Sequence, residues 1–314
     1  MRILPLLVCS GALAITATVQ GQGNSQTEYL DAQKEPPMLG IHWARGFQPN
    51  ARAAEEAKDA KAALGTRRSP NMTNHGGVIM PQANTTAIFW GTSWGSYSGD
   101  KITGIDSWYQ GFSNSNYAKT SDEYTGTNGQ VGPVVNHSGH LIDTSASSGG
   151  GSTSTILSEV CKVIKNNPDP SGNGYYAVYT DTPRGNAGYC AWHSAGTCSN
   201  GVRLQFAYFF KLDGDAGCDP QDTTTGHSQG LAAIANVSGH ELSEARTDPA
   251  SPGAWYDSQG AENGDKCAWT FNVPSVTFSN GTVWKIQGEW SNAAYTAGTG
   301  YPNNSGQKGC VDGH

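Results

Sequence analysis

Apolar positions recur along the chain with two spacings, one typical of buried strands and the other of amphipathic helices. Short apolar runs predict strands at residues 86–90, 175–180, 202–210 and 282–290. Apolar residues at helical spacing predict one helix near 105–112 and a second near 156–164, and Pro168 ends the second. No fixed-period repeat runs through this pattern, which speaks against a propeller or a solenoid.

A third predicted helix, at residues 228–246, carries the most informative polar residues of the chain. Its apolar side consists of Leu231, Ile234, Ala235, Leu242 and Ala245. His240 and Glu244, at positions i and i+4, project together from another side. Glu241 lies about 100° around the helix from His240. We expect one imidazole and one carboxylate to face a common cavity, with a second carboxylate beside them.

The spacing of these three residues is typical of a metal-binding helix. His240, Glu241 and Glu244 form H-E-x-x-E, which is the zinc-helix pattern H-E-x-x-H with a glutamate as its last residue. Imidazole nitrogen and carboxylate oxygen both bind zinc at about 2.0–2.2 Å. The pattern predicts that His240 and Glu244 bind a divalent metal and that Glu241 is a general base. The alternative is that all three side chains only cap and solvate the helix.

The segment after this helix, residues 247–269, is rich in acids and poor in bases. Because unpaired like charges repel, so many carboxylates near His240 favour a bound cation. Glu262 follows Glu244 by 18 residues and is the expected third ligand. Asp265 is the alternative ligand, or a neighbour that orients His240. The remaining candidate residues of the cleft are Asp248, Asp257 and His193.

Zinc is the expected cofactor, and calcium bound by the same oxygens is the alternative. His193 lies three residues after Cys190 and is a candidate remote ligand or an electrophile in the cleft. The alternative for His193 is a partly buried, hydrogen-bonded neighbour of a disulfide.

The composition narrows the class of protein. Only 14% of the 314 residues are charged, and 19 basic against 26 acidic residues give a formal net charge of −7. Because binding phosphates requires clustered lysine and arginine, no nucleic-acid partner is expected. Forty-one glycines with many aromatic residues suit a secreted, loop-rich α+β or β domain.

The start of the chain predicts export. Residues 1–21 have the pattern of a signal peptide, with Arg2 before an apolar run that reaches Ala14. This run is shorter than the roughly 20 residues of a membrane span, so no span is expected, and an uncleaved anchor is the alternative. Six cysteines remain after its removal: Cys161, Cys190, Cys198, Cys218, Cys267 and Cys310. An even number in an exported chain predicts three disulfides, and their pairing stays open.

Two segments follow the predicted signal peptide. Residues 22–74 are polar and predict an N-terminal prosegment or linker, with one Ala-rich helix at 51–64. Arg67 and Arg68 are a candidate processing site, and solvated surface charge is the alternative. Residues 75–314 are the predicted folded domain.

The helix and the loop after it resemble the secreted phosphate-induced protein family of plants, also called the Exordium family. The resemblance is carried by SGHELSEARTDP at 238–249, AWYD at 254–257 and ENGDKC at 262–267. GYCAWH at 188–193 and VWKIQGEWSN at 283–292 are more loosely similar. The resemblance implies a zincin-like α+β single domain with a mixed sheet and a metal-site helix, rich in loops and stapled by disulfides. The N-terminal region departs from the plant pattern, so the chain looks like a microbial relative.

Two functions of different classes fit this sequence. The first is an extracellular zinc-dependent hydrolase, most simply a peptidase, in which Glu241 activates water. The second is a secreted binding or signalling protein with a structural or vestigial metal site, whose ligand is a peptide or a glycan of the cell wall. The family is described as growth-related and without an agreed activity, so the resemblance does not decide between them.

Overall fold

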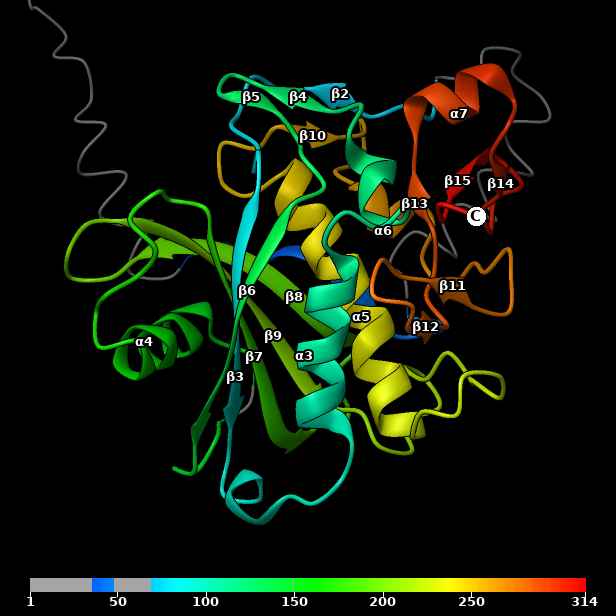
Figure 1. The fold of residues 1–314 in the computed structure, drawn as a ribbon. Coiled ribbons are helices and arrows are strands. Elements are labelled where there is room, and N and C mark those ends of the chain that lie inside the picture. Colours follow the sequence, from blue (N-terminus) through cyan, green and yellow to red (C-terminus); the bar gives the residue numbers. More distant parts are fainter. Residues whose placement is uncertain (1–35, 48–68, 149) are drawn as a thin grey trace, which may run out of the picture.

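A six-stranded mixed sheet organises the molecule (Figure 1). The computed structural model describes residues 36–47, 69–148 and 150–314, so the predicted signal peptide and the predicted helix at 51–64 lie outside the described residues. The strand order is β1-β8-β9-β7-β3-β6. These strands are β1 (Leu39–Trp43), β3 (Ala83–Trp90), β6 (Val135–Asp143), β7 (Gly174–Pro183), β8 (Tyr189–Thr197) and β9 (Arg203–Lys211).

Strand direction divides the sheet into two parts. β3 pairs in parallel with β6 and with β7, and β7 pairs in parallel with β9. β8 runs antiparallel to β9, and β1 runs antiparallel to β8. The first seven residues of β7, GYYAVYT, are all buried, as expected of a parallel strand that is covered on both faces.

Helices cover both faces of this sheet (Figure 1). The helices α3 (Lys101–Phe112) and α5 (Gln229–Thr247) lie on one face, and α4 (Thr153–Val163) lies on the other. Ser228 begins α5 because its side chain accepts a hydrogen bond from the N–H of Leu231. Every residue of α5 from Gly230 to Thr247 is buried, so α5 is a central helix rather than a surface helix.

Short elements complete the fold beside this core. They are β2 (Thr73–Asn74), η1 (Trp94–Ser96), η2 (Ala118–Ser121), β4 (Thr125–Gly126), β5 (Gly129–Gln130), β10 (Trp255–Tyr256), α6 (Asn263–Lys266), β11 (Val276–Thr277), β12 (Val283–Trp284), β13 (Glu289–Trp290), α7 (Asn292–Ala297), β14 (Tyr301–Pro302) and β15 (Lys308–Val311). The short strands pair as β10-β2, β11-β12, β13-β15-β14 and β4-β5. The molecule is therefore of mixed α+β architecture, as the sequence predicts.

Most of the predicted elements are present. The strands predicted at 86–90 and 175–180 lie within β3 and β7, the strand predicted at 202–210 matches β9 to within one residue, and the three predicted helices are α3, α4 and α5. The single strand predicted at 282–290 is wrong, because β12 and β13 belong to different small sheets. Between them the N–H of Gln287 donates to the side chain of Asn236 on α5, at 2.8 Å, instead of to a neighbouring strand.

Three disulfides are present, as predicted, and the structure gives their pairing: Cys161–Cys198, Cys190–Cys218 and Cys267–Cys310. The first joins α4 to the residue that follows β8. The second joins β8 to the loop before α5. The third joins the residue that follows α6 to β15.

The folded part begins earlier than the predicted boundary at residue 75. Residues 36–47 and 69–74, which belong to the predicted prosegment or linker, contain β1 and β2. β1 is an edge strand of the central sheet, and Ala44 directly after it has no exposed surface. The pattern of the sequence misses β1 because its five residues stand alone in a polar segment.

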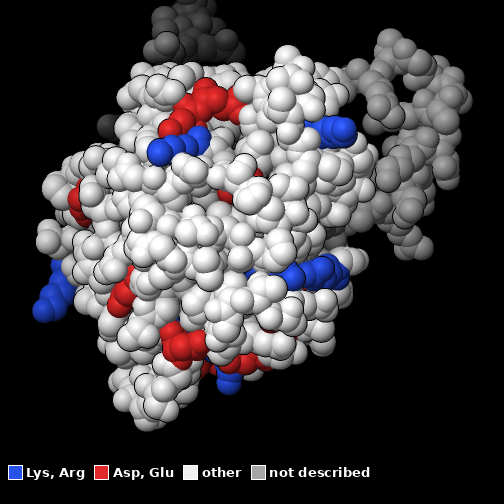
Figure 2. Space-filling view, turned by 45° about the vertical axis from the view of Figure 1, so that its right-hand side comes forward, with Lys and Arg blue, Asp and Glu red and all other residues white. Residues whose placement is uncertain are grey.

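Charged side chains are sparse on the surface. Figure 2 shows one face on which lysine, arginine, aspartate and glutamate are scattered over a largely uncharged surface. Among the described residues, no helix has both the length and the apolar character to cross a membrane. The three disulfides fit an extracellular protein.

Candidate metal centre

Helix α5 carries the histidine and the two glutamates of the H-E-x-x-E pattern into the interior. Leu231, Ile234 and Leu242 of the same helix pack in the main core, as predicted. His240, Glu241 and Glu244 have no exposed surface. Burying a charged group costs free energy unless the group has a partner. The groups around these three side chains therefore indicate what compensates for their burial.

Four other polar residues reach the same place from three further elements. His42 comes from β1, His193 from β8, and Glu262 and Asp265 from the first turn of α6. Together they form what we term the central cluster: His42, His193, His240, Glu241, Glu244, Glu262 and Asp265. Of these seven residues, only Asp265 has more than a few per cent of its side chain exposed, at 22%.

The donor atoms of the central cluster are spaced like ligands of one small cation. His240 Nε2 lies 3.1 Å from Glu244 Oε1 and 3.7 Å from Asp265 Oδ1. His193 Nε2 lies 3.4 Å from Glu262 Oε2 and 3.9 Å from Glu244 Oε2. Two ligand atoms that are each about 2.1 Å from a tetrahedral zinc are about 3.4 Å apart. The observed distances bracket this value, and His240, Glu244 and Asp265 form one group that could hold a metal ion. Glu262, the expected third ligand, belongs to none of the groups found among the described residues.

Many of these atoms lack a hydrogen-bond partner in the described structure. They are both ring nitrogens of His42 and of His193, Nε2 of His240, both carboxylate oxygens of Glu241, and Oε2 of Glu244 and of Glu262. Buried polar atoms are rarely left without a partner, and each exception requires an explanation. A cation coordinated by several of these lone pairs supplies one.

The protonation of the central cluster without a metal follows from its burial. Burial lowers the pKa of His193 to about 3 and the pKa of His240 to about 4. Burial, followed by the nearby charge of Glu244, raises the pKa of Glu241 and of Glu262 well above the ordinary value. A divalent cation reverses this preference, because it favours ionised carboxylates and neutral imidazoles.

Neighbouring groups fix the orientation of the candidate ligands. The N–H of Asp265 donates to Glu244 Oε1 at 2.8 Å. The side-chain amide of Gln287 lies 3.1 Å from His240 Nδ1 and donates to the carbonyl of Gly264 at 2.9 Å. In this orientation Nδ1 of His240 accepts, so Nε2 carries the proton of the neutral ring. Metal binding through Nε2 requires the opposite tautomer, with the oxygen of Gln287 turned toward Nδ1.

His42 is a member of the central cluster that the sequence patterns do not reveal. Its ring stacks on the ring of His240, with centroids 4.1 Å apart and an interplanar angle of 3°. Its other face stacks on Trp269, with centroids 4.6 Å apart. His42, His240 and Glu241 form one of the groups that could hold a metal ion. The only local signal for His42 is the short apolar run LGIHW, which does not indicate a ligand.

The predicted cleft residues occupy different positions relative to the central cluster. His193 is in the central cluster, where it forms a candidate metal group with Glu241 and Glu244. Asp248 is buried beside it and accepts a hydrogen bond from the N–H of Ala254 at 2.6 Å. Burial and the charge of Glu262 raise the pKa of Asp248 to about 8.

Asp257 is the predicted cleft residue that turns away from the central cluster. Its carboxylate forms an ion pair with Lys266 Nζ at 2.7 Å and accepts N–H groups of its own turn. It belongs to none of the candidate metal groups found among the described residues.

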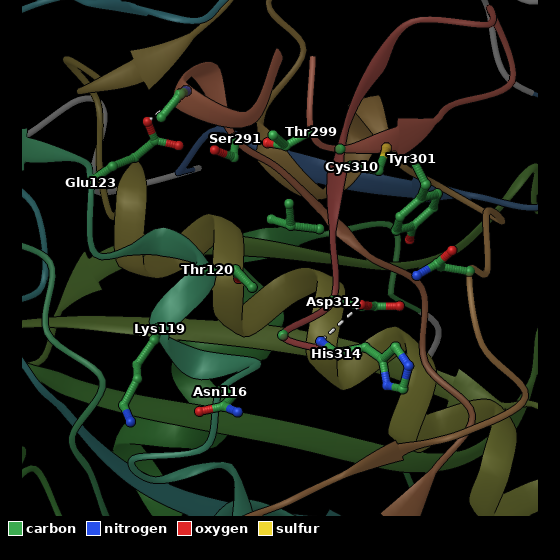
Figure 3. Close-up of a pocket in the computed structure, with 15 residues that line it drawn as sticks. Asn116, Lys119, Thr120, Glu123, Ser291, Thr299, Tyr301, Cys310, Asp312 and His314 are labelled. Carbon is green, nitrogen blue, oxygen red and sulfur yellow. Dashed lines mark hydrogen bonds between the residues drawn. The ribbon is translucent and has the colours of Figure 1, made fainter. Parts of the chain in front are cut away.

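Open space on the described surface lies away from the central cluster. A hollow of about 620 Å³ lies beside the C-terminal strands (Figure 3). Its lining includes Asn116, Lys119, Glu123, Asp312 and His314, and no member of the central cluster. The candidate metal centre is instead enclosed by the described residues, apart from the Asp265 side chain, which is 22% exposed.

Comparisons with known proteins give no relative. No family model matches the chain, and neither a curated protein nor a solved structure matches it. The resemblance to the phosphate-induced protein family stays a prediction from the motifs.

Proposed function

We propose that the protein is an extracellular, zinc-dependent hydrolase of the peptidase type with a zincin-like core. The observation that carries the proposal is a set of buried imidazole and carboxylate atoms that lie 3.1–3.9 Å apart, several of them without hydrogen-bond partners. His240 and Glu244 would hold the cation with Asp265, or with Glu262 in its place, which would leave a fourth position open, and His193 is a further donor beside them. Imidazole and carboxylate donors suit zinc, whereas calcium takes six to eight oxygens.

Glu241 is the proposed general base. It follows His240 directly, and both of its oxygens lack a hydrogen-bond partner. A bound cation supplies Lewis acidity toward a carbonyl oxygen. The oxygen of a water attacks the carbonyl carbon while Glu241 takes its proton, and Glu241 returns that proton to the amine as the C–N bond breaks.

The first test is the metal content of protein purified without chelators or an affinity tag. Elemental analysis should give one zinc per chain in the wild type and less than a tenth of that in His240→Ala. Asp257→Asn is the matched control, because it alters a neighbouring carboxylate that lies outside the central cluster. Equal zinc in all three proteins, or none in the wild type, would refute the proposed centre.

The second test is hydrolysis. Peptide, ester and glycan substrates are screened with and without a chelator, and zinc is restored to the chelated sample. Chelator-sensitive cleavage of peptides is the expected result. Cleavage that a chelator leaves unchanged would place the chemistry elsewhere in the molecule.

A secreted binding protein with a closed metal centre is the second candidate function. Two observations favour it: the burial of the donor atoms, and the hollow of Figure 3 on a different part of the surface. One tightly held zinc without hydrolysis of any substrate, together with glycan binding that Lys119→Ala weakens, would support this function over the hydrolase.

A further inference from the structure

β1 separates the central cluster from solvent. It pairs along β8, which would otherwise be the edge strand of the central sheet (Figure 1). β1 is the first described element of the chain, and the next is β2 (Thr73–Asn74). An edge strand offers unpaired N–H and C=O groups to any extended chain. In this structure β1 pairs with these groups of β8.

The backbone of β1 fills the space next to the candidate ligands. Gly40 has a φ of +38°, and its N–H donates to Glu262 Oε1 at 3.2 Å. A Cβ atom at Gly40 would lie 2.1 Å from Glu244 Oε2 and 2.3 Å from the ring of His193. Only a residue without a side chain allows the strand to approach this closely.

His42 completes the seal from the same strand. The pairing of β1 with β8 is irregular between Leu39 and His42 and again between His42 and Trp43. The His42 ring lies on His240, and both of its nitrogens are buried without a hydrogen-bond partner. A bulged strand can direct a side chain in this way. His42 therefore brings two ring nitrogens without hydrogen-bond partners to the candidate metal group that it forms with His240 and Glu241.

We propose that β1 is an internal blocking strand and that the vacated edge of β8 binds an extended peptide. Main-chain hydrogen bonds to β8 give such a peptide its affinity. The lack of space for a Cβ atom at the position of Gly40 favours a glycine in the peptide where it passes the metal centre. Side-chain hydrogen bonds also hold the segment of β1: Thr153 Oγ1 and Ser194 Oγ donate to the carbonyls of Pro36 and Pro37, Arg45 donates to the carbonyl of Asp219, and Trp269 Nε1 donates to the carbonyl of Trp43. The inference rests on the proposed function for the chemistry that follows opening, but the exchange of β1 for a peptide does not depend on it.

Gly40→Ala provides the test, since its Cβ would clash with Glu244 and His193 and so displace β1. Gly46→Ala is the matched control: it also has a positive φ, of +80°, but its Cβ would meet nothing within 4 Å. The probe is a fluorescent peptide of residues 36–47, PPMLGIHWARGF. Fluorescence anisotropy should show binding to Gly40→Ala at least about tenfold tighter than to wild type or Gly46→Ala. The same peptide carrying Gly40→Ala should not bind.

Hydrogen exchange of the wild-type protein gives a test without a variant. Amides of β1 should exchange through local opening, at least about tenfold faster than amides of β9. Exchange of β1 only by global unfolding, or no peptide binding by folded Gly40→Ala, would show that β1 is a permanent strand.

The outcomes separate this inference from the proposed function. Peptide binding and rapid exchange of β1 without zinc or hydrolysis would refute the hydrolase and leave the blocking strand. Zinc-dependent hydrolysis that is equally fast in wild type, Gly40→Ala and Gly46→Ala would refute the blocking strand and leave the hydrolase.

Discussion

Single residues of α5 determine what the candidate metal centre can do. His240 and Glu244 lie one turn apart with Nε2 and Oε1 separated by 3.1 Å, whereas Glu241 points its two free oxygens at neighbours on other elements. Adjacent positions on one helix therefore have different roles in the proposed site: two hold the metal, and one moves a proton.

Glu241→Gln and His240→Ala should separate these roles. Glu241→Gln keeps the shape of the side chain but cannot accept a proton, so kcat should fall by about 10² to 10⁴ with zinc content unchanged. His240→Ala removes a ligand and should lose both zinc and activity. Steady-state kinetics and elemental analysis on the same samples check the prediction. Loss of zinc from Glu241→Gln would make Glu241 a ligand, which the candidate group with His193 and Glu244 also permits.

A carboxylate far from the metal centre should control acid stability. Burial by itself raises the pKa of Asp222, but hydrogen bonds from Thr225 and Thr224 outweigh it and hold the pKa below its ordinary value of 3.8. Because the folded pKa is below the unfolded pKa, this stabilisation is complete above about pH 4 and is lost as the pH falls through the folded value.

Asp222→Asn should accordingly lower the free energy of unfolding by about 1 kcal/mol at pH 7 and by progressively less below pH 4. Urea unfolding at a series of pH values measures the difference. Asp219→Asn is the control from the same loop, because its side chain accepts one backbone N–H, that of Gln221. An effect of Asp222→Asn that does not change with pH would contradict the assignment.

At the scale of elements, the metal centre depends on how α6 and β1 pack against α5. Glu262 and Asp265 lie at the start of α6 and form a capping box, in which the side chain of each residue accepts a hydrogen bond from the backbone N–H of the other. The Cys267–Cys310 disulfide fastens the residue after α6 to β15. The Cys161–Cys198 disulfide lies instead at α4, on the opposite face of the sheet.

Removal of these two disulfides should affect metal binding differently. They close chain segments of similar length, 43 and 37 residues, so each should contribute about 4 kcal/mol to stability. Replacing Cys267 and Cys310 by serine should also weaken zinc binding, because α6 positions two candidate ligands. Replacing Cys161 and Cys198 should leave the zinc affinity unchanged. Competition with a chromogenic chelator measures that affinity, and equal affinities in both double variants would contradict the role of α6.

For the whole molecule, the central cluster joins four separate parts of the chain. β1, β8, α5 and α6 each supply at least one of its residues. Binding of a cation to such a site stabilises the folded state against the unfolded one, since the unfolded chain has no preformed site.

Chelation should therefore lower the thermal stability of the wild-type protein. At a free metal concentration of 1,000 times Kd the linked stabilisation is about 4 kcal/mol. Differential scanning calorimetry should show a decrease in Tm with EDTA, which added zinc reverses and added calcium does not. His240→Ala is the control, whose Tm should not respond to either treatment. Recovery with calcium alone would favour the oxygen-bound calcium site.

The sequence by itself determined the elements with strong periodicity and the residues that one element holds together. Helix α5, with His240 and Glu244 on neighbouring turns, follows from the 3.6-residue period of a helix, and the disulfide count follows from six cysteines in a chain whose start predicts export. Glu262 and Asp265 were predicted because their loop follows α5 closely and is rich in acids.

Tertiary structure alone decided what crosses between distant segments. His42 reaches His240 over 198 positions of sequence through a five-residue strand whose pattern has no helical or long alternating period. Between β12 and β13 the N–H of Gln287 donates to the side chain of Asn236 on α5, and the N–H of Gly288 donates to the carbonyl of Thr270, so neither pairs with a neighbouring strand. Such contacts depend on which surfaces pack together, a property of the whole fold that no local window of residues contains.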